Sequence, residues 1–288
     1  MINNVVIIPS EYKDEGFVCA KQIVKRIVSH DRSVHISEKY KGCFEEIRNV
    51  CFLKEEKLFD NCELVLIAGG DGSIIHAARK AALSKVPIIG VNLGRLGYLA
   101  ELELDDIHML SCIFEGNFTL EKRMMLSYEI VKHDGSVLVG EPALNDIVLT
   151  SVGNTNRVVD IEIHAGESET FAGLFKGNGI IASTPTGSTA YALAAGGPVI
   201  DPLLDCINIV PICPHSLTAR PMLFSKDSVL KLINTGRVTV NVSADGSDEY
   251  TIEPGEYVRI KKSEYSAEFV RIRNTSFYEV LKKKMTDK

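Results

Sequence analysis

The segment LVLIAGGDGSIIHAARKAAL, residues 64–83, constrains the fold of this chain more than any other. Its first part is a continuous apolar run, which is typical of a strand buried on both faces. Its last part has the apolar spacing of a helix, and only the glycine-rich stretch GGDGS joins the two. A strand that passes through so short a turn into a helix predicts a parallel sheet covered by helices.

Strands and helices alternate along the first hundred residues. Strand-like runs stand at residues 4–10, 33–37, 63–70 and 86–94, and helical spacing stands at 12–29 and 73–84. Residues 43–59 show no clear pattern. Because such alternation is typical of parallel sheets, we predict an α/β N-terminal domain over residues 1–110.

From about Leu120 onward, short alternating strands take over. They include LSYEIVKHDG, DIVLTS, VVDIEIHAG, RVTVNVSADG, YTIEPGEYVRIKKS and AEFVRIRN. Turn residues separate many of them, so we predict a mainly antiparallel β domain over residues 111–275, with the boundary in the stretch 103–120. Residues 276–288 are predicted to form a helix that packs back on one of the domains, with the N-terminal domain as the candidate.

Composition and charge exclude several classes of function. The 288-residue chain has a net charge of −6 and a pI of 5.7, which disfavours a nucleic-acid partner because such binding needs a basic face. Lys282, Lys283 and Lys284 form one dense basic run, which is typical of a solvated helix face. No apolar run approaches the roughly 20 residues of a membrane span. The start MINNVVII lacks the basic region of a secretory signal.

Seven cysteines lie at positions 19, 43, 51, 62, 112, 206 and 213. Their number is odd and no pair has C-x-x-C spacing, so the pattern indicates reduced, mostly buried thiols rather than a disulfide framework. No pair of His or Cys residues has the spacing of a zinc site. We therefore expect a cytoplasmic protein without zinc.

The glycines of GGDGS have two possible functions. They can provide a tight turn, or they can let backbone N–H groups approach phosphate oxygens in front of a helix N-terminus. Their place after a parallel strand, where open α/β sheets bind ligands, favours the second. Ser73 is a candidate cap for the helix that follows, and Asp71 could likewise do no more than cap.

The residue between the glycines narrows the chemistry. The segment matches neither G-x-x-x-x-G-K-[ST] nor G-x-G-x-x-G, so it offers a phosphate no lysine and offers Asp71 instead. A carboxylate repels phosphate unless a metal ion or a reacting hydroxyl stands between them. Asp71 therefore suits either a base for a hydroxyl nucleophile or a magnesium ligand.

A second tract, residues 175–202, repeats the strand, loop and helix order with small residues. A flexible loop is the alternative, but GIIAST is strand-like and STAYALAAGG is helix-like with a glycine stop. Its hydroxyls suit a neutral ring and ribose edges; they belong to Ser183, Thr184, Thr186, Ser188 and Thr189. Asn145 and Asp146, at the start of another strand, can hold a ribose by its hydroxyls or form an ordinary turn.

With these stretches the chain resembles the NAD kinase family. The matching motifs are GGDGS (69–73), NLGRLGYLAEL (92–102), EKRMML (121–126), LNDIVL (144–149) and GIIASTPTGSTAYALAAGGPVIDP (179–202), within about residues 60–275. GGDG alone is shared with lipid kinases and phosphofructokinases, whereas the last tract together with NLGRLGYL is specific. The resemblance implies an α/β domain followed by a β domain, and a dimer or tetramer. Charge and apolar runs, as above, indicate no nucleic-acid and no membrane partner.

The resemblance also implies an activity and its residues. The family phosphorylates the 2′-hydroxyl of the adenosine ribose of NAD, with ATP or another phosphate donor and a divalent ion such as Mg²⁺, and yields NADP. Asp71 would be the general base, with Gly70, Gly72 and Ser73 beside it. The residues that would contact the dinucleotide are Asn145, Asp146, Thr186, Ser188, Thr189, Ala190, Tyr191 and Asp245. Arg123 matches a basic position outside the chemistry, and Lys176 and Arg95 are candidates for meeting phosphate or for surface ion pairs.

One position departs from the family pattern. The family has an Asp where this chain has Asn178, toward the nicotinamide end of the dinucleotide. Asn keeps the hydrogen bonding but removes a negative charge beside a cationic ring, so we hypothesise weaker discrimination of NAD⁺ from NADH.

Two other functions remain open. A sugar-phosphate or lipid kinase would also use GGDG, but a phosphofructokinase should carry a Thr-Ile-Asp-Asn-Asp type segment, and a lipid kinase gives no reason for the tract at 179–202. A non-catalytic dinucleotide sensor would keep the pocket but gains nothing from a carboxylate beside phosphate.

Overall fold

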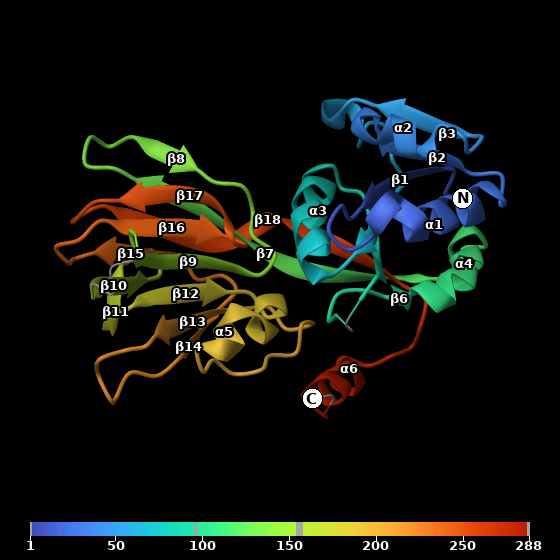
Figure 1. Cartoon of the computed structure of the whole chain (residues 1–288). Coiled ribbons are helices and arrows are strands. Elements are labelled where there is room, and N and C mark those ends of the chain that lie inside the picture. The colour runs from blue at the N-terminus through green and yellow to red at the C-terminus, as the bar shows by residue number, and fades with distance from the viewer. Residues whose placement is uncertain (1, 95–96, 154–157, 287–288) are drawn as a thin grey trace. The chain divides into compact units, whose positions relative to one another are not determined.

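The structure, a computed structural model, describes residues 2–94, 97–153 and 158–286. Its contacts divide the chain into two compact units (Figure 1). Unit 1 comprises residues 1–122 and 267–288, and unit 2 comprises residues 123–266. The C-terminal helix therefore belongs with the N-terminal part of the chain.

Unit 1 contains a parallel sheet, as the alternation of strands and helices predicted. Its strands are β1 (Asn4–Pro9), β2 (Ser33–Ser37), β3 (Val50–Leu53), β4 (Leu64–Gly69) and β5 (Ile88–Asn92), in the order β3-β2-β1-β4-β5. β6 (Leu102–Glu103) and the end of β18 (Tyr257–Arg271) pair with β5 in parallel. The helices that follow the strands of this unit are α1 (Val18–Val28), α2 (Lys41–Phe44), α3 (Asp71–Leu83) and α4 (Leu110–Phe114), with 3₁₀ turns η1 (Glu15–Phe17), η2 (Glu38–Tyr40), η3 (Glu55–Lys57) and η4 (Leu104–Met109). The C-terminal helix α6 (Phe277–Thr286) comes after the last strand, β18.

The core of unit 1 is formed by an apolar strand and by the apolar face of a helix, both visible in the sequence. All six residues of β4 are buried, which explains its continuous apolar run. α1 buries Ala20, Ile23, Val24 and Ile27, whose spacing puts them on one helical face. That face packs on strand residues such as Val5, Ile7 and Leu66 in one cluster.

Unit 2 contains two antiparallel sheets, which confirms the predicted β-rich part of the chain. One sheet has the order β14-β13-β12-β9-β16-β17, and the other contains β11, β10, β15 and β18, with β7 beside β18 and β8 beside β7. Their bounds are β7 (Thr119–Val131), β8 (Val137–Val139), β9 (Asp146–Ser151), β10 (Val159–Ala165), β11 (Thr170–Gly177), β12 (Gly179–Ser183), β13 (Cys206–Ile212), β14 (Met222–Ser225), β15 (Leu230–Asn234), β16 (Val240–Ala244) and β17 (Ser247–Ile252). The runs YTIEPGEYVRIKKS and AEFVRIRN were expected as separate strands, but β18 continues from one into the other without a turn.

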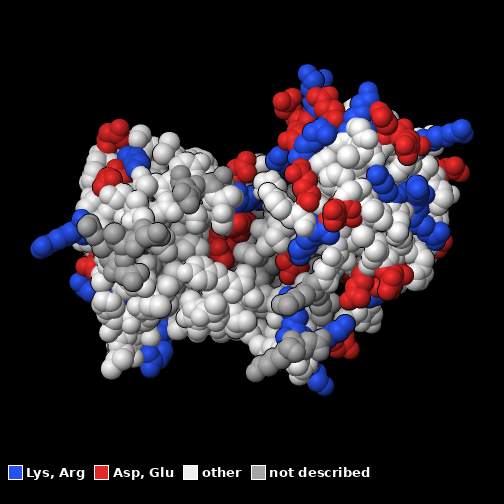
Figure 2. All heavy atoms as spheres, viewed as in Figure 1, with Lys and Arg blue, Asp and Glu red and all other residues white. Residues whose placement is uncertain are grey.

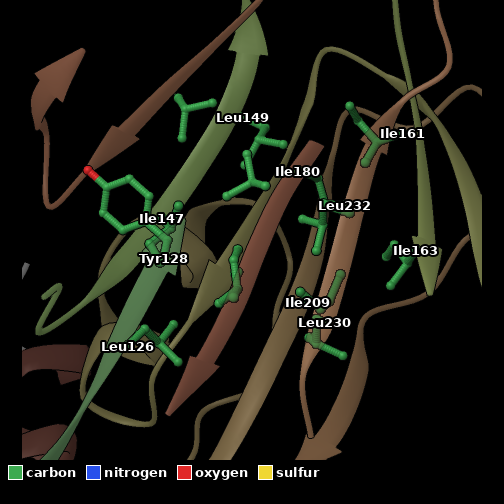
Figure 3. Close-up of a cluster of buried hydrophobic side chains, with 14 of the residues drawn as sticks. Leu126, Tyr128, Ile147, Leu149, Ile161, Ile163, Ile180, Ile209, Leu230 and Leu232 are labelled. Atoms are coloured by element: carbon green, nitrogen blue, oxygen red, sulfur yellow. The ribbon is translucent and has the colours of Figure 1, made fainter. Parts of the chain in front are cut away.

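The core of unit 2 lies between these sheets. Figure 3 shows Tyr128, Ile147, Leu149, Ile161 and Leu232 among its buried side chains, which come from β7, β9, β10 and β15. Alternate residues of β10 and β15 are buried, as expected for strands with one face on a core. This rigid sandwich carries η5 (Thr186–Thr189) and α5 (Tyr191–Ala194), which follow β12.

Two local expectations are wrong. The prediction of mostly buried cysteines fails, because Cys43, Cys51 and Cys213 are exposed and the other four are half-buried. Cys51, for example, lies on β3, which ends the strand order in unit 1. Ser73 does not cap α3, since the helix begins at Asp71 with Gly70 as its N-cap residue and without a side-chain cap.

The described surface carries charges of both signs. On the face that Figure 2 shows, Lys and Arg side chains are interspersed with Asp and Glu over unit 1, so that face has no broad field of one sign. Among the described helices, none is both long and apolar enough to cross a membrane.

Candidate active site

The glycine turn GGDGS lies where the direction of the sheet reverses. From β1 the chain adds β2 and β3 on one side, whereas β4 and β5 extend the sheet on the other, so the reversal falls between β1 and β4. Ser10 follows β1 and the turn follows β4; a Cβ on Gly69 would lie 3.4 Å from the Cβ of Ser10. Open α/β sheets bind ligands at this point, which makes the turn the leading candidate site in unit 1.

Asp71 is held firmly at this turn. Its Oδ2 accepts a hydrogen bond of 2.8 Å from the backbone N–H of Tyr98, and its Oδ1 accepts one of 3.3 Å from Leu99. Gly97 packs against the carboxylate so closely that a Cβ there would overlap Oδ1. The side chain is still 28% exposed. Each carboxylate oxygen has a further lone pair, so Asp71 can still accept a proton or a metal ion.

A lysine that the motif lacks is supplied by another segment. Lys13, in the loop after β1, places its Nζ against Gly70, where a Cβ would overlap it, and a Cβ on Gly94 would lie 3.8 Å from the same Nζ. Gly70 has extended backbone angles, φ −115° and ψ −175°, which any residue can adopt. A glycine is needed here because a side chain would collide with Lys13. Lys13 was not predicted as a site residue, because only the neighbouring positions of β1 and β4 bring it to the turn.

Unit 2 holds the Asn145–Asp146 pair through the half-buried aspartate Asp245. Asp245, in the turn between β16 and β17 with φ +51°, accepts backbone hydrogen bonds from Leu144 (2.8 Å), Asn145 (2.7 Å) and Asp146 (3.0 Å). Its own N–H donates to the carbonyl of Asp146 at 2.9 Å. Asp245 therefore fixes the backbone at the start of β9.

Asn145 and Asp146 are both nearly buried, at 8% and 6% exposure. Burial, and then the nearby charge of Asp245, raises the pKa of Asp146 to about 7. A carboxyl group with this pKa changes charge near neutral pH, so it can donate a hydrogen bond on the acid side and only accept on the basic side.

This pKa predicts a particular dependence of stability on pH. Between the unfolded pKa near 4 and the folded pKa near 7, the folded state binds more protons at Asp146, so its contribution to the free energy of unfolding falls as pH rises through this range. Asp146→Asn should remove this fall. Urea titrations from pH 4 to 8 measure the difference between variant and wild type. Asp227→Asn, which changes an exposed carboxylate of the same unit, is the control, and a difference independent of pH would contradict the assignment.

The small-residue tract uses most of its hydroxyls internally. Thr184 donates to the carbonyl of Leu144 at 2.6 Å and accepts from the N–H of Gly187 at 3.0 Å. Ser188 donates to Pro185 at 2.7 Å and accepts from Ile200 at 3.0 Å. These side chains are fully buried, so they hold the shape of the tract.

The tract also packs directly on the Asn145 segment. A Cβ on Gly187 would overlap the backbone of Asn145, and the carbonyl of Asn145 accepts the N–H of Thr184 at 2.8 Å. Arg123, buried, donates to Thr186 Oγ1 at 3.3 Å. Tyr191, by contrast, is 45% exposed at the start of α5.

The remaining candidates differ in their surroundings. Lys176 on β11 forms an ion pair of 2.9 Å with Asp160, and its side chain is 54% exposed. Asn178 is half-buried between β11 and β12, and its N–H donates to the carbonyl of Ile212 at 2.9 Å. Arg95 lies outside the described residues. The structure thus gathers Asp71 with Gly70, Gly72 and Ser73 in unit 1, and gathers Asn145 and Asp146 with Asp245 and the small-residue tract in unit 2.

Comparisons with known proteins agree over the whole chain. The family model described as ATP-NAD kinase N-terminal domain matches residues 17–118, and the ATP-NAD kinase C-terminal domain model matches residues 144–272. The NAD kinase of Thermoanaerobacter sp. (strain X514) is 34% identical over 291 residues, which cover 100% of both chains. The NAD kinase of Symbiobacterium thermophilum is 40% identical over 226 residues, 78% of each chain.

Solved structures show the same fold. Yeast NADH kinase complexed with NADH has a TM-score of 0.88 at 21% identity, and the match covers 99% of this chain and 88% of that one. An NAD kinase from Archaeoglobus fulgidus in complex with ATP has a TM-score of 0.73 at 24% identity, over 99% and 98% of the two chains.

Proposed function

This chain belongs to the NAD kinase family, and from this premise we propose that it transfers a phosphoryl group from ATP to the 2′-hydroxyl of the adenosine ribose of NAD. The product is NADP, and the protein is a phosphotransferase with an alcohol acceptor. The observation that carries the proposal is the Asp71 carboxylate, fixed by Tyr98 and Leu99 in the glycine turn at the reversal point of the sheet.

Phosphoryl transfer asks the protein mainly for positioning and charge neutralisation. The bond from the ribose oxygen to phosphorus forms as the bond from phosphorus to ADP breaks, and Asp71 takes the proton of the hydroxyl. The glycines of the turn offer backbone N–H groups to phosphate oxygens at the start of α3. Lys13, next to Gly70, adds a positive charge on the phosphate side.

For a divalent ion such as Mg²⁺, the described residues of this site supply one carboxylate ligand, that of Asp71. The described residues contain no group of three or more His, Cys, Asp or Glu side chains that could hold a metal. Mg²⁺ is commonly held by one or two carboxylates together with substrate phosphates, and Asp71 supplies such a carboxylate. The ion would neutralise the donor phosphates, and most of its ligands would come from the nucleotide.

We assign the dinucleotide to the residues that Asp245 organises. Asn145 and Asp146 can bond the ribose hydroxyls, and their backbone is held in place by Asp245 and by the buried tract behind it. Thr186, Thr189, Ala190 and Tyr191 would contact the rings, whereas Ser188 supports the tract from inside.

One assay tests the proposed function against its rivals. The purified protein is incubated with NAD, ATP and Mg²⁺, and NADP is quantified by chromatography. Formation of NADP supports the proposal. Consumption of ATP only with a sugar phosphate or a lipid would indicate the other GGDG kinases, and NAD binding without turnover would indicate a sensor.

Asn178 predicts the preference between the two forms of the substrate. The side chain keeps hydrogen bonding but carries no charge, so kcat/KM for NAD⁺ and NADH should be closer together than in an Asn178→Asp variant. A charge pair near a protein surface is worth roughly a few kcal/mol before desolvation. The ratio of kcat/KM for NAD⁺ to kcat/KM for NADH should therefore be about tenfold or more higher in Asn178→Asp than in the wild type. If the variant has the same ratio as the wild type, Asn178 does not determine the discrimination between NAD⁺ and NADH.

The setting of the protein is also part of the proposal. Seven free cysteines suit the reducing cytoplasm, and the family resemblance suggests a homodimer or homotetramer. Sedimentation of the purified chain measures the second point directly.

A further inference from the structure

The C-terminal helix brings a lysine to the carboxylate of the glycine turn. Lys284 Nζ lies 3.9 Å from Asp71 Oδ2 and 4.2 Å from the centre of the Tyr98 ring. Tyr98 is the residue whose N–H holds Asp71. One cation therefore contacts both the proposed base and the residue that positions it.

Lys284 lies on the half-buried face of α6. Ser276 and Glu279 cap the helix start reciprocally, with bonds of 2.7 Å and 3.3 Å. Phe277, Val280, Leu281 and Lys284 are half-buried and follow the spacing of one helical face. Phe277 contacts the Tyr98 ring from the same face, at 6.4 Å between centroids. The chain thus places a lysine where this stripe would otherwise continue with an apolar residue.

The three terminal lysines consequently differ. Lys282 and Lys283 are exposed, as the sequence predicted for the whole run, but Lys284 is only 26% exposed and that expectation is wrong for it. Because no residue of α6 is fully buried, apolar packing alone gives the helix a weak hold on unit 1.

We propose that Lys284 is a catalytic residue that the C-terminal helix supplies to the phosphoryl group in transfer; this rests on the proposed function. A carboxylate beside phosphate is repulsive, and a cation at 3.9 Å offsets its charge. The ammonium group has three donors, so it can bond a phosphoryl oxygen while it stays on the Tyr98 ring. Lys284 keeps its proton throughout, and the proton of the hydroxyl still goes to Asp71.

Three variants of the full chain test this role. Lys284→Met keeps the length of the side chain and continues the apolar stripe, so α6 should remain folded on unit 1. Lys284→Arg keeps the charge. Lys283→Met makes the same chemical change on the exposed side of the same helix.

The measurement is kcat and the two KM values for NADP formation. Removal of one donor aimed at developing charge typically costs 10²–10³ in kcat, so Lys284→Met should lose on the order of 100-fold in kcat while KM for NAD changes little. Lys284→Arg should recover most of this loss, and Lys283→Met should behave as the wild type.

Other results would overturn the inference in distinct ways. An unchanged kcat in Lys284→Met would show that the contact with Asp71 is incidental. A higher kcat would show that α6 covers the carboxylate and restrains it. An equal loss of kcat in Lys284→Arg and Lys284→Met would show that Lys284 acts through packing and not through its charge. If the wild type makes no NADP, the proposed function itself fails, and that outcome is separate from all three.

Discussion

Asp71→Asn should lower kcat for NADP formation by a factor on the order of 10²–10⁴, the usual contribution of a general base. The amide cannot take the hydroxyl proton, and it also removes the negative charge that a metal ion would bind. The shape of the side chain is almost unchanged, so substrate binding should suffer less than turnover. Steady-state kinetics with NAD and ATP, followed by NADP formation, provide the measurement.

The structure indicates that this variant will fold. The amide oxygen of Asn can still accept the N–H of Tyr98, and the bond that is lost, to Leu99, is the longer one at 3.3 Å. Asp60→Asn, which changes an exposed carboxylate of the same unit, is the matched control and should retain activity. Near-normal turnover in Asp71→Asn would refute the role of this carboxylate.

The parallel sheet was predictable because local pattern and burial agree in unit 1. β4 is apolar at every position and is buried at every position, and α1 buries the stripe that its spacing marks. The same agreement made the antiparallel strands of unit 2 visible. The continuity of β18 was not predicted, because Ser263 and Glu264 in its middle are typical turn residues, whereas in the structure they lie within one strand.

The contacts of the glycine turn GGDGS were not predictable in the same way. Asp71 was predictable from its place between glycines, but Lys13 and Lys284 come from opposite ends of the chain. No local pattern links them to the turn, because their positions depend on the order of strands and on the docking of α6. The glycine at position 97 had a motif around it, yet its reason, the carboxylate packed against it, is a tertiary contact.

The hydroxyl groups of the small-residue tract could bond either a ligand or the protein itself, and only the packing shows which. Thr184 and Ser188 were expected to face a ligand, but both are buried and bonded to backbone within the tract. Residue type states what a side chain can bond, whereas the chain path decides whether it bonds protein or ligand. The support that these residues give to Asn145 is therefore a property of the fold.

Asp245→Gly should lower the free energy of unfolding of unit 2 by about 1.5–4.5 kcal/mol. The change leaves the N–H groups of Leu144, Asn145 and Asp146 without their acceptor, and each such part-buried hydrogen bond contributes about 0.5–1.5 kcal/mol. Glycine accepts the φ of +51°, so backbone strain does not contribute to the loss. Urea unfolding followed by tyrosine fluorescence measures the effect.

Asp245→Asn separates the hydrogen bonds from the charge. Its oxygen can take the place of Oδ1, which accepts from Asn145 and Asp146, but its NH₂ would face the N–H of Leu144. We expect a loss of stability between those of wild type and Asp245→Gly. Removal of the charge should also lower the pKa of Asp146, since the charge of Asp245 is the second cause that raises it, after burial. If Asp245→Gly were as stable as the wild type and bound NAD equally well, Asp245 would not be the residue that organises this part of the site.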